Sequence, residues 1–300
     1  MKGAAVVSDR VEAPARGGLL ADYVALTKPR LNGLVVASSA AGYYLGGAAS
    51  PDFVALTQAV VGTALVAGGA AALNQVAERD TDALMRRTRM RPLPDGRVTP
   101  ADARLFGVGL AAAGLLLLAW RTNWLAAALA LATLAIYLVI YTPMKRRSSL
   151  ATFVGAVPGA LPPLIGWTAA HGSVASGGLS LFAIVLLWQI PHFMAIAWLY
   201  RDDYRLAGFP MLPVVDPQGG RAARQALWYA AMLLPASALP AMVGIAGWTY
   251  LWVAIGLGAV FVWLASRFAL ARTDASARAL FYGSITYLPL LWIAMIADRV

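Results

Sequence analysis

Long apolar runs, separated by short polar stretches, recur along almost the whole chain. A helix needs about 20 apolar residues to cross the roughly 30 Å hydrocarbon core of a bilayer. Runs of suitable length, with soft ends, occupy residues 27–47, 54–76, 103–120, 124–142, 151–170, 179–200, 225–246, 249–266 and 280–297. The pattern therefore predicts an all-α polytopic membrane protein with nine transmembrane helices.

The composition agrees with a membrane protein. Of the 300 residues, 60% are hydrophobic and only 13% are charged, whereas a soluble domain carries about 25% charged residues. So little charge cannot cover the surface of a water-soluble monomer. Cysteine is absent, which excludes a disulfide scaffold, a cysteine-based metal site and thiol catalysis. The two histidines, His171 and His192, leave little room for a histidine-rich metal site.

The first 22 residues lack an apolar run and mix basic with acidic side chains. These features argue against a secretory signal and against a mitochondrial transit peptide. We expect residues 1–22 to form a short disordered cytosolic tail and residues 23–300 to form a single intramembrane domain.

The charged residues are concentrated on one side of the predicted bilayer. If the chain crosses the bilayer nine times, the 24 Lys and Arg residues fall on one side, with the exception of Arg121 and Arg299. The positive-inside rule makes this side cytoplasmic, so we expect the N-terminus there and the C-terminus across the membrane. This placement explains the net charge of +10 without a nucleic-acid partner. Acidic residues contribute little to topology, yet all but Asp52 and Asp298 of the 14 lie on the same side.

The second predicted span ends in a regular set of oxygen-bearing side chains. Asn74, Glu78 and Asp82 are four residues apart, so they line one face of a helix. Carboxylates at the mouth of a span are costly unless they hold a cation. Oxygen ligands suit Mg²⁺, which is usually shared between carboxylates and a substrate phosphate. The spacing therefore favours a magnesium site.

Arginines follow this cluster at positions 86, 87, 89 and 91. Guanidinium groups bind phosphate oxygens, so the neighbouring carboxylates and arginines together indicate a diphosphate site. The alternative is a solvated loop with internal ion pairs, but the regular spacing of the carboxylates favours the site.

The sixth predicted span ends in a similar way. Tyr200, Asp202 and Asp203 close it, and His192 lies within it, about 20° from the helix face of Asp203. After both spans, a Pro-Leu-Pro-like turn precedes a Gly-Arg pair, at 92–97 and 210–221. This weak repeat suggests a duplicated four-helix unit. Two acidic clusters facing one cavity would hold more than one Mg²⁺.

Three further features have two interpretations each. The run Lys145-Arg146-Arg147 is either a topology signal or part of the diphosphate site. Lys28 and Arg30 either add cations to the site or anchor the first span by snorkelling. The three prolines at 158, 162 and 163 predict a broken helix in the wall of an intramembrane cavity.

These residues resemble a known family. The pattern Asn74-x₃-Glu78-x₃-Asp82 resembles the first Asp-rich motif of the UbiA-type intramembrane prenyltransferases. Three longer stretches resemble the branch of this family that farnesylates protohaem IX. The first is ERDTDALMRRTRMRPLP at 78–94, and the second is YTPMKRR at 141–147 together with GAVPGALPPLIGW at 155–167. The third runs from WQIPHF at 188–193, through Asp203 and Tyr204, to GFPMLP at 208–213. The resemblance runs from about residue 23 to the C-terminus.

The resemblance implies a nine-helix, Mg²⁺-dependent enzyme of the bacterial inner membrane. Its substrates would be farnesyl diphosphate and protohaem IX, and its products haem O and diphosphate, with haem A synthase or oxidase assembly factors as protein partners. The second motif of the wider superfamily carries two Asp residues four apart, whereas here Leu199 precedes Asp203 by four and the acids are adjacent. The haem-modifying branch has the same departure.

The residues therefore receive the following expected roles. The expected catalytic residues are Asn74, Glu78, Asp82 and Asp203, and the expected metal ligands are Asn74, Glu78, Asp82, Asp202 and Asp203. The expected diphosphate contacts are Arg87, Arg91, Lys145 and Arg146. The expected haem contacts are His192, Tyr200, Lys28 and Arg30. His192 is either an axial ligand of the haem iron or a buried hydrogen-bonding group.

Two other functions fit part of the sequence. A prenyltransferase of the same fold could instead attach a chain to a quinone precursor, because spacing alone does not identify the acceptor. A transporter would also have broken helices and an internal repeat. However, the charges gather at one face rather than at the midplane, which argues against transport.

Overall fold

The computed structural model describes residues 18–300, except for positions 49 and 51. In chain order its helices are α1 (Leu19–Leu26), α2 (Pro29–Gly46), α3 (Phe53–Ala77), α4 (Arg79–Asp82), α5 (Pro100–Arg121), α6 (Trp124–Ala135), the π-helix η1 (Ile136–Tyr141), α7 (Thr142–Met144), α8 (Ala151–His171), α9 (Ser176–Leu199), α10 (Arg201–Leu206), α11 (Leu212–Val215), α12 (Gly220–Ala236), α13 (Leu239–Met242), α14 (Trp248–Ala271) and α15 (Asp274–Ala297).

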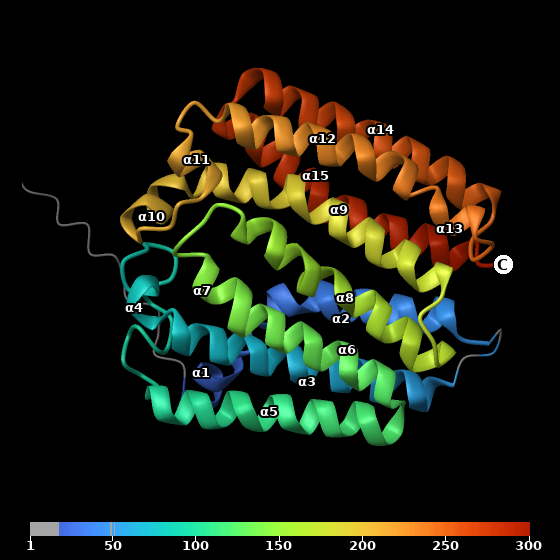
Figure 1. Cartoon of the computed structure of the whole chain (residues 1–300), viewed down its shortest axis with the longest axis horizontal. Helices are drawn as coiled ribbons and strands as arrows, with labels where there is room; N and C mark the ends of the chain where they lie inside the picture. The colour runs from blue at the N-terminus through green and yellow to red at the C-terminus, as the bar shows by residue number, and fades with distance from the viewer. Residues whose placement is uncertain (1–17, 49, 51) are drawn as a thin grey trace, which may run out of the picture.

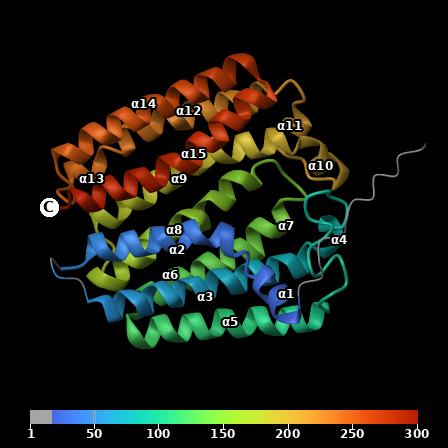
Figure 2. The ribbon, with the colours of Figure 1, turned by 180° about the vertical axis from the view of Figure 1, so that it is seen from behind.

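The long helices lie roughly side by side (Figure 1). Helices α3 and α5 pair on one flank, and α9, α12, α14 and α15 pack together on the other. Helix α8 lies between these groups and contacts both α2 and α9. Viewed from behind, the same order is kept, and the short helices α4, α10 and α11 remain at one end of the bundle (Figure 2).

Seven helical segments in the described part of the chain are long and apolar enough to cross a bilayer: 53–77, 100–121, 124–144, 151–171, 176–199, 248–271 and 274–297. Helices α2 and α12 lie alongside these seven (Figure 1). Both are more polar, since α2 contains Arg30 and Asn32 and α12 contains Arg221 and Arg224. The fold is therefore an all-α membrane protein, and the predicted count of nine is compatible with it.

Helix α8 is continuous, so the prediction that its prolines break it is wrong. Pro158, Pro162 and Pro163 all lie inside the helix. A membrane helix tolerates proline because neighbouring helices hold its backbone in place. Here α2 packs so closely that a Cβ on Gly42 would collide with the carbonyl oxygen of Pro163, and one on Gly166 with that of Ser39. Backbone contact between the two helices replaces the predicted break.

The N-terminal boundary also differs from the expectation. Residues 1–17 of the predicted tail lie outside the described residues. Residues 19–22, however, form the first turn of α1, where Asp22 is buried and makes an ion pair with Arg97. Arg97 also donates a hydrogen bond to the carbonyl oxygen of Met90. The ordered domain thus begins before residue 23, because α1 is held against the loop that follows α4.

The ends of α3 and α9 share one backbone feature. Glu78, after α3, has φ −101° and ψ 8°, and Tyr200, after α9, has φ −110° and ψ 23°. Each residue leaves helical geometry for one position, and a short helix, α4 or α10, follows. The two helix breaks lie at the same end of the bundle (Figure 1). This backbone match agrees with the weak repeat in the sequence.

Candidate active site

The segment from the last turn of α3 to the end of α4 buries the three predicted metal ligands. Asn74 is 1% exposed, Glu78 is 7% exposed and Asp82 is 1% exposed. Each has a cation beside it: Lys28 Nζ lies 3.3 Å from Asn74 Oδ1, Lys145 Nζ lies 2.7 Å from Glu78 Oε1, and Arg91 Nη1 lies 2.7 Å from Asp82 Oδ2. Buried charges need such partners. The set combines oxygen ligands for a metal ion with donors for phosphate oxygens.

Asn74 is held from two sides. Its Nδ2 donates to Thr142 Oγ1 at 3.1 Å, while its Oδ1 accepts from Lys28. Thr142 in turn donates to the carbonyl oxygen of Tyr137 at 2.8 Å. This bond spans the π-helical turn η1, and π-helical turns are frequent at functional sites. The turn therefore places Thr142 where it fixes the amide of Asn74.

Lys145 lies between a carboxylate and two aromatic rings. Its Nζ is 5.3 Å from the ring centroids of both Tyr141 and Phe209. The ring of Tyr141 packs against Gly155 of α8, where a Cβ would collide with it. These rings and the ion pair with Glu78 leave Lys145 half-buried, so its charge acts in a low-dielectric setting.

Lys28 lies in the turn between α1 and α2, before the first residue of α2. Burial, followed by the positive charge of Arg91, lowers the pKa of Lys28 to about 7.

The end of α9 uses aromatic side chains where α3 uses carboxylates. Counting from the two helix breaks, Tyr200 corresponds to Glu78 and Tyr204 corresponds to Asp82. The guanidinium carbon of Arg87 lies 5.0 Å from the ring centroid of Tyr200 and 4.9 Å from that of Tyr204. Arg87, from the first cluster, thus bridges to the second through two cation–π contacts.

The two adjacent acids of α10 are placed differently from the carboxylates of α3. Asp202 is exposed and pairs with Arg205 at 2.8 Å. Asp203 is half-buried and, with Arg86, Arg87 and Tyr200, lines a depression of about 390 Å³. Asp202 lines the same depression, so both adjacent acids border a hollow that Arg86 and Arg87 also line.

His192 does not join this end of the bundle. Its Nδ1 is 2.7 Å from Ser284 Oγ of α15, and its ring stacks between Trp188 and Phe281. In these contacts the partners of His192 thus lie on α9 and α15, and none of them belongs to the cluster at the end of α3 or to α10. These contacts match the alternative of a hydrogen-bonding group between α9 and α15.

Arg30 and Arg146 are exposed. Among the described contacts, neither reaches the buried cluster. Sequence analysis missed Thr142 and gave no role to Tyr141, although both belong to the YTPMKRR stretch. Thr142 and Tyr141 could have been found from their positions, because they precede Lys145 by three and four residues, about one helical turn.

The donor set fits Mg²⁺ only if a ligand adds further oxygens. In residues 18–300, positions 49 and 51 excepted, no three Asp, Glu or His side chains lie close enough to hold a metal ion together. Mg²⁺ usually takes one or two carboxylates and completes its shell with water and substrate phosphates. Glu78, Asp82 and the amide oxygen of Asn74 match that need, and the adjacent cations match the phosphates.

The amino-acid sequence was compared with models of known protein families, and one family matches most of the chain. The family model described as "UbiA prenyltransferase family" matches residues 35–293. The chain belongs to the UbiA prenyltransferase family. In this structure the two helix breaks lie at one end of the bundle, and the buried carboxylates with their cations lie at the first of them.

Several relatives similar to this UbiA protein are named protoheme IX farnesyltransferase. The chain is 45% identical to the protoheme IX farnesyltransferase of Solibacter usitatus, with 93% of this chain and 98% of the relative covered. It is 46% identical to the protein of that name from Opitutus terrae, with 95% and 97% covered, and 44% identical to that from Myxococcus xanthus, with 93% and 95% covered.

Solved structures show the same fold at low identity. A structure described as digeranylgeranylglyceryl phosphate synthase matches with a TM-score of 0.78 at 17% identity, over 93% of this chain and 98% of that one. A UbiA homologue from Archaeoglobus fulgidus bound to GPP and Mg²⁺ matches with a TM-score of 0.66 at 16% identity, over 92% and 99%.

Proposed function

We propose that this UbiA protein transfers the farnesyl group of farnesyl diphosphate to the 2-vinyl group of protohaem IX, giving haem O and diphosphate. The observation that carries the proposal is the buried set Asn74, Glu78 and Asp82 with its three cations. The acceptor is proposed from curated relatives at 42–46% identity, which are named protoheme IX farnesyltransferases.

Asn74, Glu78 and Asp82 would hold Mg²⁺ together with the diphosphate. When bound, Mg²⁺ stabilises the negative charge that develops on the leaving diphosphate. Thr142 and Lys28 orient the amide of Asn74, so that its oxygen can face a metal ion. Glu78 lies at the break between α3 and α4 and Asp82 lies at the end of α4, so one short backbone segment carries both carboxylates.

Lys145 and Arg91 bind the diphosphate oxygens in this proposal, and Arg87 adds a third cation. Lys145 and Arg91 already lie beside Glu78 and Asp82, so diphosphate and metal share one compact group of charges. Preorganised charges stabilise a transition state without reorganising as charge develops. Tyr200 and Tyr204 orient Arg87 through their rings.

The bond between the allylic carbon and the diphosphate oxygen breaks, and its electron pair leaves with the diphosphate. The vinyl electrons form the new carbon–carbon bond and leave a positive charge on the vinyl carbon next to the porphyrin ring. A water molecule adds to that carbon and releases one proton to the solvent, which leaves the hydroxyl group. Apolar surroundings delay water until the new bond exists. For the acceptor we propose Tyr200, Lys28 and Arg30 as contacts, whereas His192 already bonds to Ser284.

We further propose that the end bearing α4 and α10 faces the cytoplasm of a bacterial inner membrane. The support is the strong excess of Lys and Arg in the connections at this end. Reporter fusions to the two termini would test the orientation. Cytoplasmic activity of both reporters would contradict it.

The acceptor is tested with purified protein in detergent, supplied with farnesyl diphosphate, Mg²⁺ and either protohaem IX or an aromatic acid quinone precursor. Mass spectrometry then reports the product. We expect a farnesylated, hydroxylated haem and no prenylated acid. Prenylation of the acid alone would assign the protein to the quinone branch, and absence of diphosphate release with either acceptor would contradict a transferase.

A further inference from the structure

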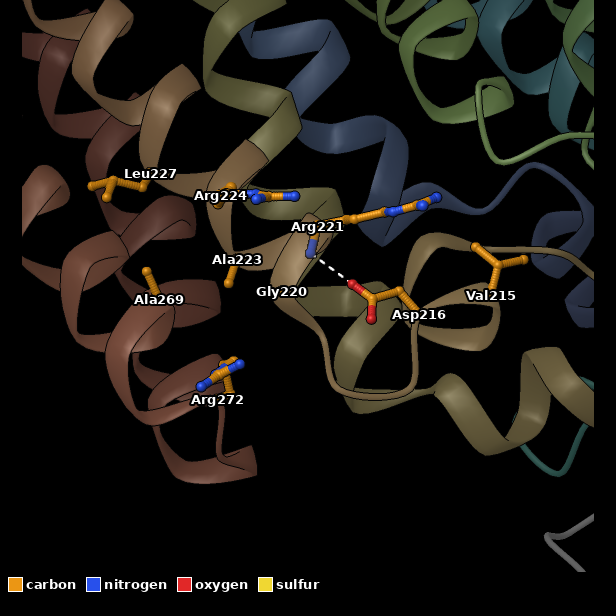
Figure 3. A pocket seen from close by; sticks show the side chains of 9 residues that line it. All are labelled: Val215, Asp216, Gly220, Arg221, Ala223, Arg224, Leu227, Ala269 and Arg272. Atoms are coloured by element: carbon orange, nitrogen blue, oxygen red, sulfur yellow. Dashed lines mark hydrogen bonds between the residues drawn. The ribbon is translucent and has the colours of Figure 1, made fainter.

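A second basic site lies away from the cluster at α3. A depression of about 530 Å³ opens between the ends of α12 and α14, next to α11. Figure 3 shows Arg221 and Arg224 on α12 and Arg272 at the end of α14. Ala223, Leu227 and Ala269 add an apolar surface to the same depression. The site thus combines three guanidinium groups with an apolar floor.

The three guanidinium groups lack carboxylate partners. Among the described residues, the ion pairs of this structure involve none of Arg221, Arg224 and Arg272. Asp216 also lines the depression, but its Oδ2 accepts the backbone N–H of Arg221 at 2.7 Å, at the start of α12. Three positive charges against one negative charge leave the depression basic, so it attracts an anion.

The residues around the depression indicate the chemical class of the anion that it binds. Arg224 and Arg272 flank the apolar stretches of α12 and α14, so they lie at the level where a bilayer has its headgroups. Next to them, Trp228 is 68% exposed and Leu270 is 82% exposed. Large apolar side chains exposed beside the depression belong to a lipid-facing surface. An amphiphilic anion can therefore place its charge on the arginines and its chains along Leu227 and Ala269.

We propose that this depression binds the phosphate headgroup of an anionic phospholipid. Basic pockets between membrane helices at the headgroup level are suited to such lipids, and arginine binds phosphate with paired donors. The lipid holds the ends of α12 and α14 together. This site is separate from the proposed transfer reaction, because none of its residues belongs to the cluster at α3.

The proposal is tested by native mass spectrometry of the full chain in neutral detergent, titrated with phosphatidylglycerol, phosphatidylcholine or inorganic phosphate. The test variant carries Arg221→Gln, Arg224→Gln and Arg272→Gln. The matched control carries Arg104→Gln, Arg267→Gln and Arg278→Gln, which remove the same charge from exposed arginines outside the depression. Thermal unfolding in detergent verifies that both variants are folded.

We expect phosphatidylglycerol to bind the wild-type protein at least about tenfold more tightly than phosphatidylcholine. The test variant should lose this preference, whereas the control variant should keep it within about twofold. If the triple variant does not fold, Arg224→Gln alone should weaken phosphatidylglycerol binding about threefold.

Three outcomes would overturn the proposal. Equal binding of the two lipids would show that the charge of the headgroup has no role. An equal loss in the control variant would reduce the effect to general surface charge. Displacement of phosphatidylglycerol by millimolar inorganic phosphate would make the depression a site for a soluble phosphate compound.

Discussion

At the end of α3, Glu78 leaves helical geometry and the short helix α4 follows; at the end of α9, Tyr200 does the same before α10. The residues four positions further on are Asp82 and Tyr204. In the first half of the molecule these positions carry carboxylates with cations beside them. In the second half they carry aromatic rings that surround Arg87.

The comparison indicates that a repeated backbone does not require repeated chemistry. Asn74 on α3, Glu78 at the first break and Asp82 on α4 are buried oxygen-bearing residues, whereas the corresponding positions at the second break, Tyr200 and Tyr204, carry aromatic rings. The second break supplies rings that orient a cation from the first half. We infer that metal binding depends on α3 and α4, while α9 and α10 position the diphosphate contact.

The largest expected effect tests the first half. Asp82→Asn keeps the size of the side chain but removes the charge that a divalent cation needs, so turnover should fall at least about 100-fold. Glu78→Gln should act in the same way. Diphosphate release and product mass measure the effect. Asp80→Asn is the matched control, because the Asp80 side chain is 87% exposed and pairs with its neighbour Arg79. Near wild-type turnover of Asp82→Asn would remove the metal site from this account.

Arg91 tests whether the cations of the first half need a particular geometry. Lysine keeps the charge but cannot make a bidentate contact, so Arg91→Lys should reduce kcat/KM for farnesyl diphosphate about tenfold. Steady-state kinetics at saturating Mg²⁺ measure this. Arg89→Lys, at an exposed position of the same loop, is the control. Unchanged KM and kcat in Arg91→Lys would make Arg91 a topology charge.

The two tyrosines test the second half. Tyr200→Leu removes a ring that faces Arg87, and a cation–π contact of this kind is worth about 0.5–2 kcal/mol. We therefore expect KM for farnesyl diphosphate to rise about threefold to tenfold. Tyr200→Phe keeps the ring and should behave like the wild type. If the Phe variant is impaired as strongly as the Leu variant, the hydroxyl matters and the ring does not.

The smallest expected effect on chemistry concerns His192. His192→Ala removes a hydrogen bond to Ser284 and two stacked contacts, so it should lower the free energy of unfolding by about 1–3 kcal/mol. The Soret band of bound haem should not move. Thermal unfolding and absorption spectra of the variant measure both effects. A shifted Soret band with unchanged stability would instead support His192 as a ligand of the haem iron.

The sequence allowed much of the fold to be predicted, because its main signals are local. Apolar runs indicate helices of spanning length. The spacing of Asn74, Glu78 and Asp82 drew attention to three residues that are all buried, but the continuous helix that it assumed is broken at Glu78, so Asp82 lies on α4. The weak repeat indicated two similar helix ends. In each case neighbouring residues along the chain determine the outcome.

Long-range contacts could not be read from the sequence. Lys28 meets Asn74 across 46 positions, and Lys145 meets Glu78 across 67, so no local pattern links either pair. The continuity of α8 depends on its close packing against α2, which overrides the effect of its prolines. Helical spacing could not reveal that His192 meets Ser284, which lies 92 positions away on α15.

The central claim is that the end of α3 binds diphosphate together with Mg²⁺. It is tested most directly by titrating the protein with a non-reactive thio analogue of farnesyl diphosphate, with Mg²⁺ and with a chelator. For the wild-type protein, we expect Mg²⁺ to tighten binding at least about tenfold, and for Asp82→Asn we expect no dependence on Mg²⁺. Equal binding of the analogue by the wild-type protein with and without Mg²⁺ would contradict the claim.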